Sequence, residues 1–245
     1  STAAALVTAA AGAPVAKHGN RGITSRSGSA DVLVALGVGI EADVACVEAC
    51  LEELGICFCF APLLHQAMKH VAPVRKRLGV PTIFNILGPL ANPAGASLQL
   101  LGVGRREIQA LLADALRLLG TQRALVVHGA DKLDEVTLAD ATLVIETGAA
   151  GTKHYQWTPE DFGLPRSDRV PLMVSGPDES AKMIRAILSG QQGPPRDIVV
   201  ANSAAALWLA GRASTLVEGA RLAAEAIDSG AARDLLARLA EKTRA

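Results

Sequence analysis

The stretch AGAPVAKHGNRGITSRSGSADVLVALGV, residues 11–38, decides the expected fold of this chain. Residues 11–16 predict a short strand, and the apolar run 32–38 predicts a helix. Between them, residues 17–31 hold four hydroxyl side chains and three glycines, together with lysine, histidine, asparagine and arginine. Glycines weaken helices, and hydroxyl side chains compete for local backbone hydrogen bonds, so this segment predicts a loop. The expected order is strand, loop, helix.

The composition of residues 17–31 predicts a binding site for an anion. Glycine lets the backbone come close to a phosphate, while exposed amides, hydroxyls and the ammonium of Lys17 supply hydrogen-bond donors. A solvated polar loop is the alternative, because loops rich in glycine and serine are common.

Length and charge limit the classes of protein to consider. With 245 residues and 50% hydrophobic content, the chain can bury a sizeable core, and we expect one domain, residues 1–245. Because 24 basic residues balance 24 acidic ones, no global field attracts nucleic acid or an anionic membrane. The sequence has no apolar run of transmembrane length and no signal peptide at its start, so we expect a cytoplasmic protein.

Strand and helix patterns alternate along the middle of the chain. The apolar run 98–103 is followed by helical periodicity that ends before Gly120, and ALVVHG, residues 124–129, is typical of a buried strand. This alternation predicts an α/β fold with a mostly parallel sheet flanked by helices. Further helices are expected at residues 61–78, 178–189 and 198–210 and in two segments of the tail divided near residues 228–230, and an ordered loop at 81–97.

An acidic pair, Asp134 and Glu135, follows the predicted strand 124–129. Open α/β sheets bind ligands beyond the carboxyl ends of their strands. Mg²⁺ usually takes one or two carboxylates together with phosphate oxygens, so the pair is a candidate magnesium site. The alternative is an ordinary charged turn.

Other residue types give less support for catalysis. The five histidines form no zinc-binding motif, and no G-x-S-x-G nucleophile turn is present. We interpret the cysteines at 46, 50, 57 and 59 as packing residues of a reducing compartment, with a zinc site as the alternative. Tyr155 and Trp157 either pack against the sheet or form a stacking platform for a ligand ring.

Four motifs in order resemble those of the anthranilate phosphoribosyltransferases. They are KHGNR with SGSAD within residues 17–31, FNILGPLANP at 84–93, HGADKLDE at 128–135 and RDIVVANSAAALWLAG at 196–211. The resemblance covers nearly the whole chain. It implies the large α/β domain of the nucleoside phosphorylase and phosphoribosyltransferase kind. It also implies a glycosyltransferase of tryptophan biosynthesis that joins anthranilate to phosphoribosyl pyrophosphate and releases pyrophosphate.

The resemblance also assigns roles to residues that match the family's motifs. It implies that phosphoribosyl pyrophosphate binds Thr2, Lys17, Thr24, Ser25 and Ser27, that anthranilate binds His18, Asn20 and Arg75, and that Mg²⁺ binds Ser1, Asp134 and Glu135. A guanidinium such as that of Arg75 can hold a carboxylate through two parallel hydrogen bonds.

The chain departs from the family pattern at its start. It begins at Ser1 inside the helix-like run TAAALVTAAAG, without the GTGGD loop, the asparagine of N-x-S-T and the small helical domain that precede this point in the family. We expect a homodimer when these parts are present. A catalytically inactive substrate-binding core is the main alternative. A nucleic-acid-binding relative is disfavoured by the balanced charge, and a nucleoside phosphorylase would share the fold without these motifs.

Overall fold

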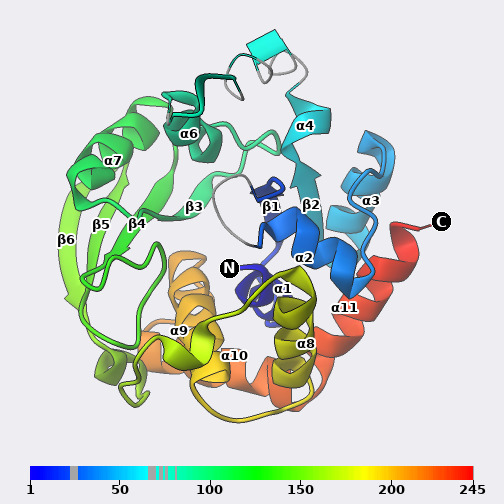
Figure 1. Cartoon of the computed structure of the whole chain (residues 1–245). Helices are drawn as coiled ribbons and strands as arrows, with labels where there is room; N and C mark the ends of the chain where they lie inside the picture. Colours follow the sequence, from blue (N-terminus) through cyan, green and yellow to red (C-terminus); the bar gives the residue numbers. More distant parts are fainter. Residues whose placement is uncertain (23–26, 66–69, 72–73, 75–76, 81, 245) are drawn as a thin grey trace.

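The computed structural model describes residues 1–22, 27–65, 70–71, 74, 77–80 and 82–244, and Figure 1 shows how its helices surround two β-sheets. The smaller sheet pairs β1 (Val15–Gly19) with β2 (Ile56–Phe60) in parallel, with Lys17 opposite Phe58. All five residues of β2 are buried. The helices near this sheet are α1 (Thr2–Ala10), α2 (Ser29–Leu36), α3 (Val44–Leu54) and α4 (Ala61–Leu64).

The larger sheet has four strands in the order β3-β4-β5-β6. Their bounds are Leu98–Gly102, Arg123–Gly129, Thr142–Gly148 and Gly151–Trp157. β3 and β4 are parallel, because α7 (Gln109–Leu118) returns the chain between them. β5 and β6 form an antiparallel hairpin, since only two residues separate Gly148 from Gly151. β4 and β5 are also antiparallel.

The α/β class is confirmed, but the expected mostly parallel sheet needs correction. In the described residues, two of the four strand pairings are parallel and two are antiparallel. The connection from β4 to β5, residues 130–141, contains no helix. Without a helical crossover the chain turns straight back, and an antiparallel pairing results. The one-domain organisation stays a prediction.

The C-terminal third is helical, as expected. It comprises α8 (Pro177–Leu188), α9 (Pro194–Leu209), α10 (Leu216–Asp228) and α11 (Ala231–Lys242). The Thr215 side chain caps α10 by accepting a hydrogen bond from the Glu218 backbone N–H at 3.1 Å. Gly230 divides α10 from α11 with a left-handed backbone, φ 81°, which a glycine adopts without strain.

Three local expectations need correction. The first strand spans residues 15–19 rather than 11–16, so Lys17 and His18 lie on β1 and the loop after it is shorter. The helix expected at 61–78 begins as α4, which ends at Leu64, and much of its remainder lies outside the described residues. The segment 81–97 holds two short helical turns, α6 (Phe84–Leu87) and η1 (Gly88–Leu90).

Two apolar cores lie on opposite faces of the larger sheet. Leu125 and Val127 of β4 join the main core, which also contains α1, the smaller sheet and the C-terminal helices. The alternating residue Val126 belongs to a second core, where Leu112 and Leu116 of α7 cover the other face. Val136 and Leu138, in the connection after β4, also belong to the main core, so this connection packs on the face of the larger sheet that is shared with α1 and the smaller sheet.

Aromatic side chains join β6 to α9. The rings of Trp157 and Trp208 meet edge to face with centroids 5.7 Å apart, and Phe162 meets Trp157 in the same manner at 5.8 Å. The guanidinium of Arg123 lies 4.4 Å from the centre of the Trp208 ring. Tyr155 and Trp157 therefore pack as side chains of the fold, but against Trp208 of α9 rather than against the sheet as expected.

The cysteines have the burial expected of packing residues. All four cysteines are free thiols, and all except Cys46 are buried. Within the described residues, no helix combines the length and the apolar character needed to cross a membrane.

Gly102, at the end of β3, permits a close backbone contact with the acidic pair's segment. A Cβ atom there would overlap the carbonyl oxygen of Asp134. We expect Gly102→Ala to lower the free energy of unfolding by about 1–3 kcal/mol, because a backbone atom cannot move aside as a flexible side chain does. Urea unfolding measures this loss. The matched control is Gly104→Ala, where the nearest atom, the Lys132 carbonyl oxygen, is 3.9 Å away. Equal stability of the two variants would contradict the prediction.

Candidate functional site

A cluster of charged and polar groups joins three distant parts of the chain. The amino group of Ser1 donates a hydrogen bond to Glu135 Oε1 at 2.6 Å, and Lys17 Nζ donates to Ser1 Oγ at 3.1 Å. Ser1 precedes α1, Lys17 lies on β1, and Glu135 lies in the connection between β4 and β5. The fold therefore brings together residues that are up to 134 positions apart.

The charges in this cluster depend on one another. Burial lowers the pKa of Lys17 below its ordinary value, and the nearby Glu135 carboxylate opposes that shift. Burial acts to raise the pKa of Glu135, and the positive charge of Lys17 opposes that shift. The charged forms of Lys17 and Glu135 stabilise each other, so removing one charge shifts the pKa of the other group.

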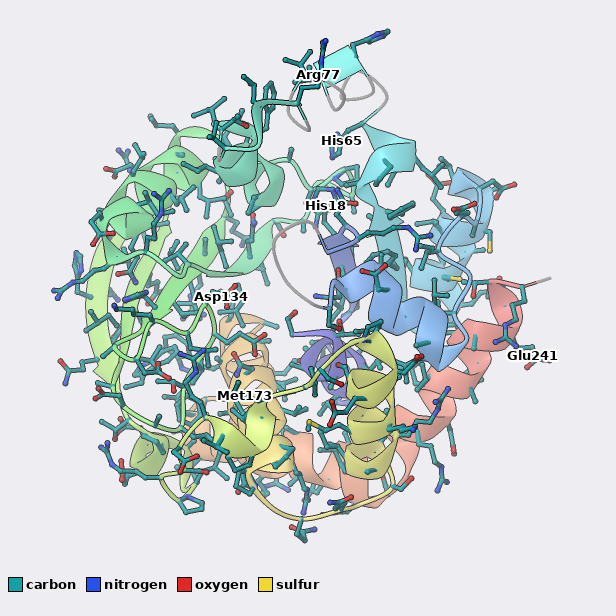
Figure 2. All side chains as sticks on the ribbon, in the orientation of Figure 1. His18, His65, Arg77, Asp134, Met173 and Glu241 are labelled. Atoms are coloured by element: carbon teal, nitrogen blue, oxygen red, sulfur yellow. The ribbon has the colours of Figure 1, made fainter. Side chains whose placement is uncertain are left out.

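The connection that carries Asp134 and Glu135 is tightly built. The Gly129 backbone N–H donates to the Leu133 carbonyl at 2.9 Å, and Thr137 Oγ1 donates to Asp131 Oδ2 at 3.1 Å. Asp134 itself is exposed, and Figure 2 shows it on the side of the larger sheet that faces the start of the chain. Glu135 of this connection reaches Ser1, and Asp134 precedes it in the chain.

The donor set here suits a hard divalent cation. Asp134 and Glu135 offer carboxylate oxygens, and Ser1 offers a hydroxyl beside Glu135. Mg²⁺ is bound in proteins by one or two carboxylates, with its other positions filled by waters and phosphate oxygens. Across the described part of the chain, no group of three or more histidines, cysteines or acidic residues could hold a metal by itself. The residues present therefore fit Mg²⁺ that is shared with a phosphate ligand.

His18 lies beside Lys17 on β1, and its side chain meets a second histidine. Its Nε2 is 3.1 Å from Nε2 of His65, which follows α4, and the two rings meet edge to face (Figure 2). Burial, His65 and Lys17 lower the pKa of His18, although a hydrogen bond with the Gly88 backbone opposes them. The neutral imidazole is therefore favoured, and it links β1 to His65 and to the backbone of Gly88.

Protonation of His18 should destabilise the fold. Its pKa in the folded protein lies below the value of about 6.5 expected when unfolded, so between these values the unfolded chain binds more protons. Stability should consequently fall as pH falls below about 6.5. We expect His18→Asn to lose less free energy of unfolding than wild type between pH 7.5 and 5.5, measured by urea unfolding.

The control for this prediction is His154→Asn, which removes an exposed imidazole from β6. The acid sensitivity of wild type should persist in that variant. If His18→Asn and wild type lose the same free energy of unfolding over this pH range, protonation of His18 does not destabilise the fold.

The loop after β1 is closed by Asp31, whose role the motif did not reveal. Asp31 Oδ2 accepts hydrogen bonds from the backbone N–H groups of Gly22 at 2.9 Å and Gly28 at 3.3 Å. These backbone bonds and the guanidinium of Arg21 hold the pKa of Asp31 below its usual range, although burial opposes them. A Cβ on Gly28 would overlap the Gly22 backbone, so glycine is required for this closure.

The structure brings some of the expected site residues together and separates others. Ser1 contacts both Lys17 and Glu135, and Asp134 is adjacent to Glu135 in the chain. Thr2 is buried in the first turn of α1, and Ser27 is half-buried before α2. His18 contacts His65 instead of this cluster, and Asn20 Oδ1 accepts from the Arg21 backbone at 2.8 Å. The expected residues Thr24, Ser25 and Arg75 lie outside the described residues.

Two contacts beyond these predictions stabilise the site. Asn92 Nδ2, in the FNILGPLANP motif, donates to the Ala16 carbonyl of β1 at 3.0 Å. The buried Asn202 of α9 bonds to the backbone of Val136, directly after Glu135. An asparagine within a largely apolar helix is the sequence signal for such a role, but the sequence does not say which backbone segment it meets.

The chain matches the family model described as "Glycosyl transferase family, a/b domain" over residues 1–233, which defines its class as a glycosyl transferase. It is 56% identical to the anthranilate phosphoribosyltransferase of Rhodospirillum rubrum over 98% of this chain and 69% of that protein. The corresponding protein of Rhodopirellula baltica is 52% identical, with 98% and 70% covered. The chain therefore belongs to the anthranilate phosphoribosyltransferase family.

Solved structures agree with this assignment. The anthranilate phosphoribosyltransferase of Thermus thermophilus superposes with a TM-score of 0.93 at 49% identity, covering all of this chain and 73% of that one. The Saccharomyces cerevisiae enzyme in complex with PRPP (phosphoribosyl pyrophosphate) and Mg superposes with a TM-score of 0.92 at 31% identity, covering 100% and 69%. A structure of the yeast enzyme with 4-fluoroanthranilate is 29% identical, has a TM-score of 0.88, and is covered over 68% of its length.

Proposed function

We propose that this protein transfers the phosphoribosyl group of phosphoribosyl pyrophosphate to anthranilate, giving phosphoribosyl-anthranilate and pyrophosphate. The observation that carries the proposal is that Lys17 and Glu135 both contact Ser1. It combines a cation for phosphate oxygens with a hydroxyl and a carboxylate for a divalent ion. That combination is what a magnesium-bound pyrophosphate ester requires.

Each part of the substrate pair has proposed partners. Thr2, Lys17, Thr24, Ser25 and Ser27 bind the phosphoribosyl donor, and Ser1, Asp134 and Glu135 hold Mg²⁺. His18, Asn20 and Arg75 bind anthranilate. The yeast relatives solved with PRPP and Mg and with 4-fluoroanthranilate support this choice of ligands.

The reaction is a substitution at the anomeric carbon of the ribose. The bond from that carbon to the pyrophosphate oxygen breaks, and its electron pair leaves with pyrophosphate. The amine nitrogen of anthranilate forms the new bond and then loses a proton. Lys17 is half-buried on β1, and its ammonium stabilises negative charge that grows on the leaving group. Mg²⁺, when bound, supplies further positive charge to the same oxygens.

Anthranilate needs orientation more than activation. Its amine must approach the anomeric carbon from the side opposite pyrophosphate, and correct placement can supply several kcal/mol of rate acceleration, of order 7–11 in the best cases. The neutral form of His18 is favoured by its surroundings, so its imidazole would lie beside anthranilate without a repelling or attracting charge. We assign it to the wall of the anthranilate site.

The test is an assay of anthranilate fluorescence with the purified protein, phosphoribosyl pyrophosphate and Mg²⁺. We expect consumption of anthranilate that needs both the donor and Mg²⁺. Titration calorimetry with each substrate accompanies the assay. Binding of both substrates without turnover would refute the proposal in favour of a substrate-binding core. The homodimer and the cytoplasmic location stay predictions, and sedimentation of the protein tests the first.

A further inference from the structure

Asn202 is a buried polar residue in the middle of α9, and only 4% of it is exposed. Its Oδ1 accepts a hydrogen bond from the Val136 backbone N–H at 2.9 Å, and its Nδ2 donates to the Val136 carbonyl at 3.0 Å. Nδ2 also donates to the Ile198 carbonyl of the same helix at 2.9 Å. One side chain thus fixes both polar groups of the residue that follows Glu135.

We propose that Asn202 is a positioning residue for the acidic pair, which fixes the carboxylates of Asp134 and Glu135 where they bind Mg²⁺. The proposal rests on the proposed function in one respect, which is that Mg²⁺ is the ion bound by these carboxylates. Asn202 itself acts through the backbone of Val136 and touches neither substrate.

The contacts specify an amide side chain. Asn202 must accept one hydrogen bond and donate two, and the amide has an acceptor oxygen and two N–H donors. A carboxylate at this position could accept from the Val136 N–H but would face the Val136 and Ile198 carbonyls without a donor. Because these groups are buried, unsatisfied partners would push the segment away from its present position.

The opposite side of the same segment is also held. Gly102 of β3 packs against the Asp134 carbonyl so closely that a side chain would not fit. Val136 is fully buried in the main core. The backbone of residues 134–136 is therefore held between β3 and α9. Its position sets where the side chains of Asp134 and Glu135 begin. The 2.6 Å contact from Glu135 to Ser1 depends on that placement.

The experiment compares wild type with Asn202→Asp and Asn202→Ala. The first keeps the shape and the acceptor, and the second removes the amide without adding a buried charge. The destabilised control is Val200→Ala, which truncates a buried side chain on the same helix and leaves the Val136 contacts in place. All proteins are assayed for the Mg²⁺ concentration that gives half-maximal turnover and for the KM of anthranilate.

Substitution of groups that orient metal ligands typically lowers metal affinity about 10- to 100-fold. We expect both Asn202 variants to need at least about 10-fold more Mg²⁺, with excess Mg²⁺ restoring turnover and the KM for anthranilate changing less than about 2-fold. Val200→Ala should unfold at a lower temperature but keep the Mg²⁺ dependence of wild type. An unchanged Mg²⁺ requirement in the Asn202 variants, or an equal change in Val200→Ala, would overturn the proposal.

A second readout does not depend on turnover. The rise in unfolding temperature caused by Mg²⁺ with pyrophosphate should be clear in wild type and in Val200→Ala, and much smaller in the Asn202 variants. If wild type shows this rise, the Asn202 variants do not, and no transferase activity is found, the proposed function fails and the role of Asn202 stands. If wild type shows no such rise, the acidic pair does not hold the ion and the role of Asn202 fails with it.

Discussion

Replacing Lys17 by methionine is expected to lower kcat/KM for phosphoribosyl pyrophosphate by about 100- to 1,000-fold, the loss typical of one donor aimed at developing negative charge. Methionine keeps the length and apolar stem of lysine but removes the ammonium that contacts Ser1 Oγ at 3.1 Å. Because the charge on pyrophosphate grows as the bond breaks, kcat should fall more than the affinity for the donor. Single-turnover kinetics with saturating donor separates these two effects.

Lys153→Met is the matched control, since Lys153 is exposed on β6. It removes the same charge from the protein without touching the cluster, so it should keep wild-type kinetics. If Lys17→Met retains wild-type kcat/KM, or if the control loses as much, Lys17 does not act on the leaving group. The unfolding curves of both variants verify that the fold is intact.

The double variant Asp134→Asn with Glu135→Gln should have the second large effect. It preserves the size of both side chains but replaces two anionic oxygen ligands by neutral amides. Outer-shell changes alone cost about 10- to 100-fold in metal affinity, so loss of both carboxylates should raise the required Mg²⁺ concentration by more than about 100-fold. Calorimetric titrations of donor binding at increasing Mg²⁺ concentrations measure this requirement.

A charge-matched control is available on α3. Glu48→Gln with Glu52→Gln also neutralises two acidic groups, and both are exposed away from the cluster. This variant should bind donor and Mg²⁺ as wild type does. Unaltered Mg²⁺ dependence in the Asp134 and Glu135 variant would exclude these residues as ligands of the ion.

Helices were predictable from the sequence because their signals are local. Glycines follow the ends of α8, α9 and α10, and apolar residues recur along each helix. The first strand was placed too early, because Lys17 and His18 are polar and therefore suggested a loop. They lie on β1 because the backbone of residues 15–19 pairs with β2, and their polar side chains meet Ser1 and His65. The antiparallel hairpin was missed, since its two-residue turn, Ala149 and Ala150, carries no turn signature.

The candidate site was predictable only as a set of motifs. Lys17 and the pair Asp134–Glu135 could each be suspected from residue type and position after a strand. Their meeting at Ser1, and the contact of His18 with His65, depend on tertiary packing between distant segments. Asn202 shows the limit most clearly, because its partner Val136 is 66 residues away and is recognised through backbone atoms that every residue has.

The pairing of Trp157 with Trp208 has a consequence for spectroscopy. They are the two tryptophans of the whole sequence, so intrinsic emission reports one place, the junction of β6 and α9, with Arg123 lying over one ring. Circular dichroism instead averages over every helix. Coincident denaturation curves from the two signals would support all-or-none unfolding. If ellipticity is lost before the emission changes, elements away from the junction open as a separate cooperative unit while the junction stays closed.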